Sequence, residues 1–362
     1  MGKYKVVVYA ISKNEEKFVD RWYDSMKEAD SIYVLDTGSK DATVDKLKGH
    51  GVNVVSKDIS PWRFDVARNC SIEMIPDLYD IYVCTDLDEI LEKGWREKLE
   101  NSWHDGVTRA RYTYNWQLDK NDKPLVSFYT DKIHIRSGYK WLHPVHEVLS
   151  YSGNENVITI EDIVLNHYPD IFKERTSYLP LLELSVKEDP YDDRNMHYLG
   201  REYMYHSKWN ECIDTLIKHL SLPKALWKDE RCASMRYISR AYKALGRINE
   251  ARMWLKLAIE EAPYLRDPWV ELGMLEYEED NYVMAIYYIE EALKIRTHAK
   301  TYINEKFSWN EVPYDILSIC YYNIYNYDKA LENVNKAITF SDEERLIRNK
   351  ELIEKAISED KE

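Results

Sequence analysis

The sequence predicts an α/β half with a Rossmann-like, mostly parallel sheet, followed by an all-α half built from helical repeats. Two observations predict this organisation. Apolar, strand-like runs alternate with amphipathic helical segments up to about residue 165, as is typical of βαβ units. Beyond residue 175 glycines become sparse and a repeating helical pattern takes over. The predicted domains are residues 1–170 and 196–362, joined by a linker helix in 171–195.

The α/β half is built from continuous apolar runs, which are typical of parallel strands covered on both faces. The expected strands are residues 5–11, 31–35, 52–55 and 81–84. An amphipathic helix is expected after the first strand and another around Arg68, whereas residues 109–116 are expected to form a further strand. Since ligands of such sheets bind beyond the carboxyl ends of the strands, the polar residues that follow each strand are the candidate binding residues.

The all-α half contains four segments in which a turn and an aromatic or aliphatic residue precede a small residue that begins a helix. These segments are SKWNEC (207–212), GRINEA (246–251), DNYVMA (280–285) and YNYDKA (325–330). The small residues are separated by 39, 34 and 45 positions (212 to 251, 251 to 285, 285 to 330), and the middle step equals the tetratricopeptide period. The longer steps predict insertions at 221–231 and 297–312. Such repeats offer a surface for a peptide or protein, or a contact for a homodimer.

Charge and composition exclude several classes of partner. The net charge is −14, with 50 basic against 64 acidic residues and no basic tract, which argues against binding to nucleic acid or to an anionic membrane. No apolar stretch approaches the roughly 20 residues that cross a bilayer, and no secretory segment is seen. The five cysteines are scattered without CxxC pairs, so we expect reduced core residues. These features predict a cytoplasmic protein without a transmembrane segment.

The segment CTDLDE (84–89) places three carboxylates directly after a buried strand. On an extended chain Asp86 and Asp88 point to the same side, whereas Leu87 points back into the core. Carboxylates this close are costly unless a cation or hydrogen-bond donors compensate them. No GxGxxG or P-loop motif occurs, so a phosphate would be held through Mg²⁺ or Mn²⁺. Asp88, supported by Asp86, is the predicted metal ligand; a solvated turn is the alternative.

Four motifs occur in a fixed order in the first 90 residues: AISKNEE (10–16), VLDTGSKDAT (34–43), FDVARN (64–69) and CTDLDE (84–89). Together they resemble the donor-binding half of family 2 glycosyltransferases of the GT-A fold. A later stretch, YKWLHPVHEVL (139–149) followed by NHYP (166–169), resembles a subgroup with tetratricopeptide repeats after the catalytic domain. The resemblance implies an inverting enzyme that uses Mn²⁺ or Mg²⁺ and moves a sugar from a nucleotide sugar, most simply a UDP-sugar. The acceptor would be a glycan, a peptide or a protein.

The resemblance also implies roles for single residues around the nucleotide. Asp36 would accept a hydrogen bond from the pyrimidine imide, and Arg68 would contact a phosphate or pyrimidine oxygen. Asn14 and Glu15 would form the rim of the pocket, and Asp86 would contact the ribose or the metal. Structural roles are the alternatives: a helix cap at Asp36, a surface ion pair of Arg68, and a helix start at Asn14.

The acceptor side requires a base that takes up a proton as the acceptor attacks the anomeric carbon. The resemblance places a His-Glu pair there, so Glu147 is the first candidate and His146 the second, while Glu89 stays open. His167, from a later loop, is expected to complete the metal shell beside Asp88. For each histidine, packing in the core is the alternative.

Two other classes of protein fit the same sequence. A nucleotidyltransferase would have a similar sheet and carboxylates, but it would normally carry a glycine-rich basic loop after the first strand, and AISKNEE has no glycine. A catalytically inactive repeat scaffold would bind partners through its repeats, with the first half as a remnant. The acidic motif and Arg68 argue against the scaffold.

Overall fold

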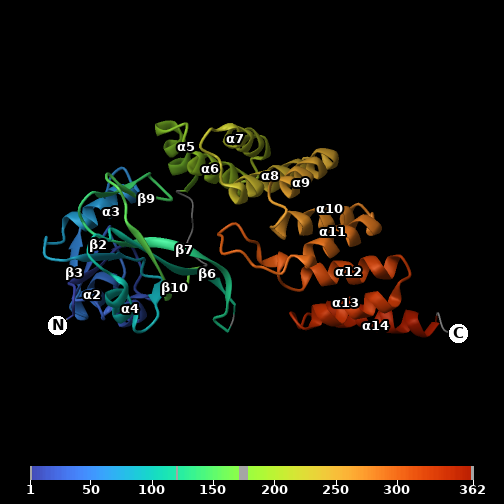
Figure 1. Ribbon diagram of the computed structural model, residues 1–362, viewed down its shortest axis with the longest axis horizontal. Coiled ribbons are helices and arrows are strands. Elements are labelled where there is room, and N and C mark those ends of the chain that lie inside the picture. The colour runs from blue at the N-terminus through green and yellow to red at the C-terminus, as the bar shows by residue number, and fades with distance from the viewer. Residues whose placement is uncertain (1, 120, 171–177, 360–362) are drawn as a thin grey trace. The chain divides into compact units, whose positions relative to one another are not determined.

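The computed structural model describes residues 2–119, 121–170 and 178–359. Contacts within the chain divide it into two compact units, Met1–Glu188 and Asp189–Glu362. The strands lie in the first unit, and the described residues of the second unit form helices and their connections (Figure 1).

The linker helix predicted for residues 171–195 lies partly outside the described residues, which omit 171–177. Helix α5 (Tyr178–Glu188) is described and belongs to the first unit by its contacts. Helix α6 (Asp193–Tyr205) follows in the second unit, after an N-cap at which Asp192 accepts a hydrogen bond from the backbone N–H of Asn195. The break between the units therefore falls between two helices.

An eight-stranded mixed sheet forms the centre of the first unit, in the order β3-β2-β1-β4-β7-β6-β10-β5, and β8 pairs with β9 in a separate two-stranded sheet. The strands are β1 (Val6–Ser12), β2 (Ser31–Asp36), β3 (Asn53–Ser56), β4 (Ile81–Cys84), β5 (Glu89–Leu91), β6 (Arg109–Leu118), β7 (Pro124–His134), β8 (Tyr139–Leu142), β9 (Val148–Tyr151) and β10 (Val157–His167).

The predicted mostly parallel sheet is a mixed sheet: one half is parallel throughout, whereas in the other half only β6 and β10 pair in parallel. Strands β3, β2, β1 and β4 run parallel, as the alternation of strands and helices predicts. Strand β7 runs antiparallel to both β4 and β6, because β6 and β7 are joined as a long hairpin. An antiparallel pair needs only a short connection, whereas a parallel pair needs a crossover.

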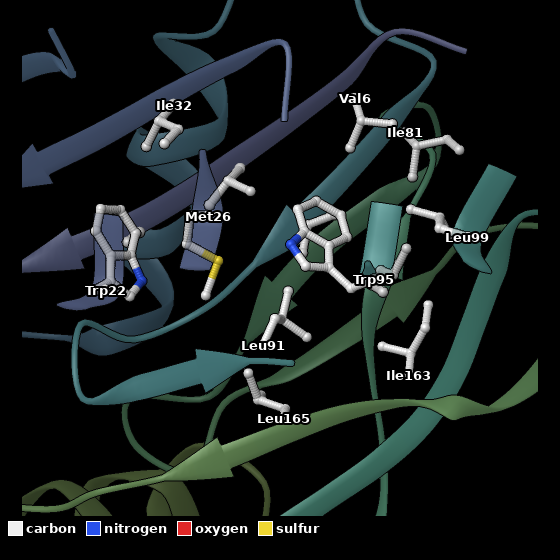
Figure 2. Packing of buried hydrophobic residues seen from close by; sticks show 14 of the residues in the cluster. Val6, Trp22, Met26, Ile32, Ile81, Leu91, Trp95, Leu99, Ile163 and Leu165 are labelled. Atoms are coloured by element: carbon white, nitrogen blue, oxygen red, sulfur yellow. The ribbon is translucent and has the colours of Figure 1, made fainter. Parts of the chain in front are cut away.

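Helices cover the first unit, and the side chains of β1 point alternately to two cores. The helices are α1 (Val19–Met26), α2 (Thr43–Gly49), α3 (Phe64–Glu73), α4 (Trp95–Ser102) and α5. Val6 and Val8 pack with Trp22 and Trp95 in the larger cluster (Figure 2), whereas Val7 and its alternating neighbours pack in a second cluster. A strand buried on both faces reads as a continuous apolar run, as residues 5–11 do.

The second unit consists of helix pairs in which each helix packs against the next (Figure 1). Its helices are α6, α7 (Trp209–Ser221), α8 (Lys228–Ala244), α9 (Ile248–Glu261), α10 (Asp267–Glu278), α11 (Tyr282–Lys294), α12 (Val312–Asn323), α13 (Tyr327–Ile338) and α14 (Glu344–Glu359), with a short 3-10 turn at Lys306–Ser308. The four small residues of the repeated motif are each the fourth residue of the second helix in a pair, and all are fully buried: Cys212, Ala251, Ala285 and Ala330. The predicted tetratricopeptide-like repeats are confirmed.

Two glycines allow the paired helices to approach each other closely. A Cβ atom at Gly273 of α10 would lie 2.6 Å from Ile289 Cδ1 of α11, and one at Gly200 of α6 would overlap the side chain of Leu216 of α7. Real Cβ atoms do not approach other atoms so closely, so a larger residue would force the facing side chain, or the helix that carries it, to move.

We expect Gly273→Ala to lower the free energy of unfolding by about 1–3 kcal/mol, the usual cost of overpacking a core. Gly49→Ala is the matched control, because Gly49 ends α2 with no atom within 4 Å of a built Cβ. It should change stability by less than about 0.5 kcal/mol. Urea denaturation of both variants measures the difference, and equal losses would show that the helices do not need a glycine at 273.

No helix in the described part of the chain combines the length and the apolar character that crossing a bilayer requires.

Candidate functional site

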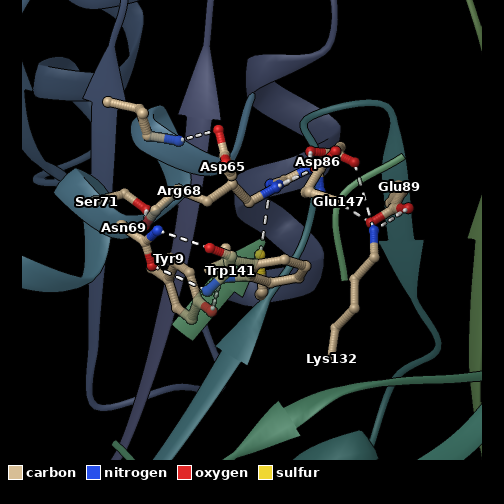
Figure 3. A network of polar contacts seen from close by, with 12 residues as sticks. Tyr9, Asp65, Arg68, Asn69, Ser71, Asp86, Glu89, Lys132, Trp141 and Glu147 are labelled. Carbon is tan, nitrogen blue, oxygen red and sulfur yellow. Dashed lines mark hydrogen bonds and ion pairs between the residues drawn. The ribbon is translucent and has the colours of Figure 1, made fainter. Parts of the chain in front are cut away.

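The polar residues at the carboxyl edge of the first sheet are linked through Arg68 (Figure 3). Arg68 lies on α3 and is almost fully buried. Its Nη2 donates to Asp86 Oδ1 at 2.7 Å, and its Nε donates to Glu147 Oε1 at 2.8 Å. The guanidinium also lies over the ring of Trp141, 5.3 Å from the centroid. Arg68 thus joins residues that the sequence assigned to the donor side and to the acceptor side.

A second cation, Lys132 of β7, lies partly buried beside the same carboxylates. Its Nζ is 3.5 Å from Asp86 Oδ2 and 3.4 Å from Glu89 Oε1. Burial raises the pKa of Asp86, but the charges of Arg68 and Lys132 outweigh it and hold that pKa well below its usual value. For Glu89, which is also buried, burial has the larger effect and the pKa is raised. The acidic cluster is therefore largely neutralised from within.

Sequence reasoning missed Lys132. It lies more than forty positions from Asp86 in a strand with no recognisable motif. The available signal is weak, because a lysine in a strand usually points to solvent. Only the pairing of β7 with β4 brings it to the carboxylates.

Asp88 and His167 lie next to each other at the outer part of this edge. His167 Nε2 is 3.4 Å from Asp88 Oδ2, and His167 Nδ1 donates to the backbone oxygen of Trp116 at 3.1 Å. The imidazole stacks on Trp116, with ring centroids 4.4 Å apart. Burial lowers the pKa of His167, but the contact with Asp88 raises it further than burial lowers it. The stacking and the backbone bond hold Nε2 toward the carboxylate, as in a metal-binding pair.

Asp36 is buried at the end of β2, where its own loop supplies hydrogen-bond donors. Its carboxylate accepts bonds from the backbone N–H groups of Gly38 (3.1 Å) and Ser39 (3.2 Å), and from the hydroxyl of Ser12 at 3.4 Å. This is the local turn chemistry that aspartate favours. Contact of Asp36 with a pyrimidine stays a prediction.

Asn14 and Glu15 join the first loop to the loop that follows β2. Asn14 Oδ1 accepts from the backbone N–H of Lys40 at 2.7 Å, and Asn14 has a positive φ of 56°. The backbone N–H of Glu15 donates to Thr43 Oγ1 at 2.7 Å. Both residues hold the two loops together, and a role for them at the rim of a nucleotide pocket also stays a prediction.

The HPVHE stretch lies between β8 and β9, beside α3. His146 has a positive φ of 50° and its ring contacts Tyr178 edge-on, with centroids 5.7 Å apart. Glu147 is the acceptor for Arg68 described above. Asn69 holds this region in place, because its side-chain amide donates to Trp141 O at 2.9 Å and accepts from Trp141 N at 3.0 Å. Asn69 thus fixes β8 through the backbone of Trp141.

His134 lies at the base of the site and is neutral. Its Nδ1 donates to the backbone oxygen of Ile135 at 2.5 Å, so its Nε2 accepts from the hydroxyl of Tyr9 at 2.8 Å. Trp141 Nε1 in turn donates to Tyr9 Oη at 3.1 Å. Burial lowers the pKa of His134 to about 3.

We expect this histidine to make the first unit sensitive to acid. The unfolded chain takes up a proton at His134 near pH 6.5, whereas the folded chain does not until about pH 3. The contribution of neutral His134 to the free energy of unfolding is complete above pH 6.5. It falls by about 2 kcal/mol between pH 6.5 and pH 5, at up to about 1.4 kcal/mol per pH unit. Urea denaturation at these two pH values should show a smaller loss in His134→Gln. The same loss in both proteins would contradict this assignment.

Comparison with known proteins finds similarity in solved structures only. No family model matches the chain, and no curated protein does. The structure of MamA is 20% identical, covering 48% of this chain and 95% of that chain with a TM-score of 0.38. The structure of YrrB, described as a TPR protein with an unusual peptide-binding site, is 16% identical. The match covers 52% of this chain and 84% of that chain, with a TM-score of 0.36. The structure of the APC/C hetero-tetramer Cut9–Hcn1 is 16% identical. The match covers 49% of this chain and 32% of that chain, with a TM-score of 0.40.

These comparisons contradict the predicted membership in glycosyltransferase family 2 and the prediction that the chain is an enzyme. The similar structures named above include no glycosyltransferase, and the GT-A assignment of the first unit has no support among them. The contacts offer a physical reason why the motifs misled: Asp86 is compensated by Arg68 and Lys132, and Asp36 by its own loop. The assignment of Glu147 or His146 as a base rested on the enzyme interpretation and is not carried further.

Proposed function

We propose that the chain is a repeat-bearing binding protein whose second unit holds a polypeptide segment. The observation that carries this proposal is the course of residues 296–311, which we call the crossing segment. It connects α11 to α12 and contacts the first helices of the preceding repeats. The repeat face thus already holds a stretch of irregular chain, with a turn at 302–303 and a 3-10 turn at Lys306–Ser308, supplied by the protein itself.

The first helices of successive pairs form one continuous face. Helix α6 contacts α8, α8 contacts α10, and α10 contacts α12. The crossing segment buries Ile303 in the apolar cluster of the first two pairs. Beside it the ring of Tyr302 lies 5.3 Å from that of Trp227 and 6.0 Å from that of Tyr198. Large rings and a buried aliphatic anchor are typical of peptide-recognition surfaces.

Two arginines of α8 hold the polar part of the segment. Arg236, which is fully buried, donates from Nη1 to the backbone oxygen of Ile303 at 3.3 Å and from Nη2 to Glu305 Oε1 at 3.0 Å. Arg240 Nη2 donates to the same carboxylate oxygen at 2.8 Å. Charge-assisted bonds of this kind are among the stronger hydrogen bonds in proteins. The face therefore favours a glutamate two residues after an aliphatic side chain.

The start of α10 recognises the backbone of the segment. Asp267 is fully buried, and its Oδ1 accepts from the backbone N–H of Glu305 at 2.8 Å and from Ser308 Oγ at 3.0 Å. The segment is thus bound through backbone groups of both kinds as well as through side chains. A partner would present an aromatic residue, an aliphatic residue and a glutamate in the order of Tyr302, Ile303 and Glu305.

The test uses a variant in which residues 296–311 are replaced by a Gly/Ser linker of equal length. A labelled peptide with the sequence of residues 299–309 is titrated into this variant and followed by fluorescence anisotropy. We expect saturable binding that weakens at least tenfold when the glutamate of the peptide is changed to glutamine, since hydrogen bonds to charged groups contribute about 1.5–3 kcal/mol. Arg240→Gln in the linker variant should weaken binding similarly, whereas Arg345→Gln should not. No binding by a folded linker variant would overturn the proposal.

A second candidate function concerns the sheet edge of the first unit. We propose that Asp88 and His167 bind Mn²⁺ or Mg²⁺, and that the diphosphate of a nucleotide or nucleotide sugar completes the metal shell beside Asn14, Glu15, Asp36, Arg68 and Asp86. The facing Nε2 and carboxylate at 3.4 Å support this proposal. Divalent ions of this type often complete their shell with substrate phosphates.

Thermal shift with UDP, GDP, CDP and dTDP, each with and without Mn²⁺, tests this second function. Stabilisation that requires both a diphosphate and Mn²⁺, and that disappears in Asp88→Ala, is the expected result. No response of the folded wild type to any diphosphate would overturn it.

A further inference from the structure

Three side chains of metal-binding type meet in the interior of the second unit. His197 comes from α6, His219 from α7 and Glu230 from α8. Both histidines are fully buried and Glu230 is 5% exposed. One ligand atom of each lies within 4.8 Å of the other two, and no other such group of three is found among the described residues. None of the functions proposed above uses these residues.

Ser234 contacts one nitrogen of each histidine ring and so determines which nitrogen of each ring could bind a metal. Ser234 Oγ lies 2.7 Å from His197 Nδ1 and 3.0 Å from His219 Nδ1. The Nδ1 atoms of both rings are thus engaged by the same hydroxyl. Both Nε2 atoms are buried and make no hydrogen bond to the described residues, and His219 Nε2 has only the Glu230 carboxylate nearby, at 3.4 Å. Leaving a buried polar atom unsatisfied costs about 1–3 kcal/mol, and two such atoms beside one carboxylate point to a missing ligand.

We propose that His197 Nε2, His219 Nε2 and the Glu230 carboxylate bind a zinc-type transition-metal ion. Two imidazoles and one carboxylate are a common set of protein ligands for zinc, whereas Mg²⁺ and Ca²⁺ prefer oxygen. Ligands about 2.1 Å from a tetrahedral zinc ion lie about 3.4 Å apart. His219 Nε2 and Glu230 Oε1 are already 3.4 Å apart. A ligand atom of His197 lies within 4.8 Å of one from each of the other two residues.

Each of the three proposed ligands is oriented by a hydrogen bond to an atom that does not bind the metal, as is usual in metal sites. A serine oxygen can accept from the Nδ1–H of both rings, which leaves both Nε2 lone pairs for the metal. The other carboxylate oxygen, Glu230 Oε2, accepts a hydrogen bond from the hydroxyl of Tyr302. The metal would therefore link α6, α7 and α8, and would connect through Tyr302 to the crossing segment.

Zinc titration of the full chain tests this proposal. The protein is stripped with a chelator, dialysed, and titrated with ZnCl₂ by calorimetry, and Co²⁺ binding is followed by its visible absorption. We expect one zinc ion per chain to be bound through these three residues, with a Co²⁺ spectrum of four-coordinate type. His197→Gln should weaken zinc binding at least 100-fold. Ser234→Ala keeps all three ligands but frees both rings, and it should weaken binding by about 10–100-fold.

One control variant separates this site from other histidines of the second unit. His206→Gln removes a half-exposed histidine that pairs with Glu202 at the end of α6. It should bind zinc as the wild type does. The proposal is overturned if the folded wild type binds no zinc, if His197→Gln and Ser234→Ala bind it unchanged, or if the control variant abolishes binding. It does not depend on peptide binding by the repeats.

Discussion

Replacing Arg236 with methionine is expected to lower the free energy of unfolding by about 3 kcal/mol. The side chain is fully buried, and its Nε donates to Glu271 Oε1 at 2.6 Å. Removing one partner of a buried ion pair costs about 3–5 kcal/mol, because the remaining charge is left without compensation. Arg240 also pairs with Glu271 and Glu305, so we expect the lower end of this range.

Urea denaturation followed by circular dichroism measures this loss. Arg345→Met is the matched control: its side chain is 47% exposed and pairs with Asp315, and exposed ion pairs contribute about 0–1 kcal/mol. Equal losses in the two variants would show that the contacts of Arg236 with Glu271 and the crossing segment do not stabilise the fold. Because Arg236 also holds Glu305, its loss should free the crossing segment and increase its proteolysis.

Arg68→Met is expected to cost about 3 kcal/mol at pH 7, the lower end of the range for a broken buried pair. Glu147, which is 12% exposed, would lose its cation, whereas Asp86 is 34% exposed and keeps Lys132 nearby. The difference in the free energy of unfolding between the wild type and this variant should decrease as the pH falls toward 4. The pKa of Asp86 is below its usual value in the wild type, so its contribution is present above about pH 4 and is lost as the pH falls further. In the variant Asp86 takes up a proton more readily, which relieves its uncompensated charge.

The matched control for Arg68 is Arg63, the residue before α3. Arg63 pairs with Asp65 and Glu188 but is 23% exposed, so we expect Arg63→Met to cost about 1 kcal/mol or less. Denaturation of both variants at pH 7 and pH 4 tests the assignment. A deficit of Arg68→Met that is the same at both pH values would contradict the role of Asp86.

The repeats could be predicted because each depends on a short-range pattern. A small residue at the fourth position of each second helix faces the neighbouring helix, and a larger one would not fit. The parallel strands could likewise be predicted from their apolar runs. The direction of β7 could not, since it depends on how the chain turns between β6 and β7, and alternation alone does not specify the pairing partner.

The residues that make up the two polar sites, one around Asp86 and one around Glu230, could be predicted only in part. Strand order predicts that Asp36, Asp86 and Asp88 lie at one edge, but the compensation by Lys132 depends on the hairpin. His197, His219 and Glu230 are 22 and 11 positions apart (197 to 219, 219 to 230), and no metal-binding motif has such a spacing on three helices. The resemblance to glycosyltransferases misled because polar residues after parallel strands also stabilise the loops themselves.

The affinity of the peptide of residues 299–309 for the wild type and for the linker variant tests the central claim most directly. If the crossing segment occupies the binding face, only the small fraction of wild-type molecules in which it has left can bind the peptide, and the apparent affinity falls by that fraction. We expect binding to the wild type to be at least tenfold weaker than to the linker variant. Equal affinities would mean that the peptide binds elsewhere and that the repeat face is not a peptide-binding surface.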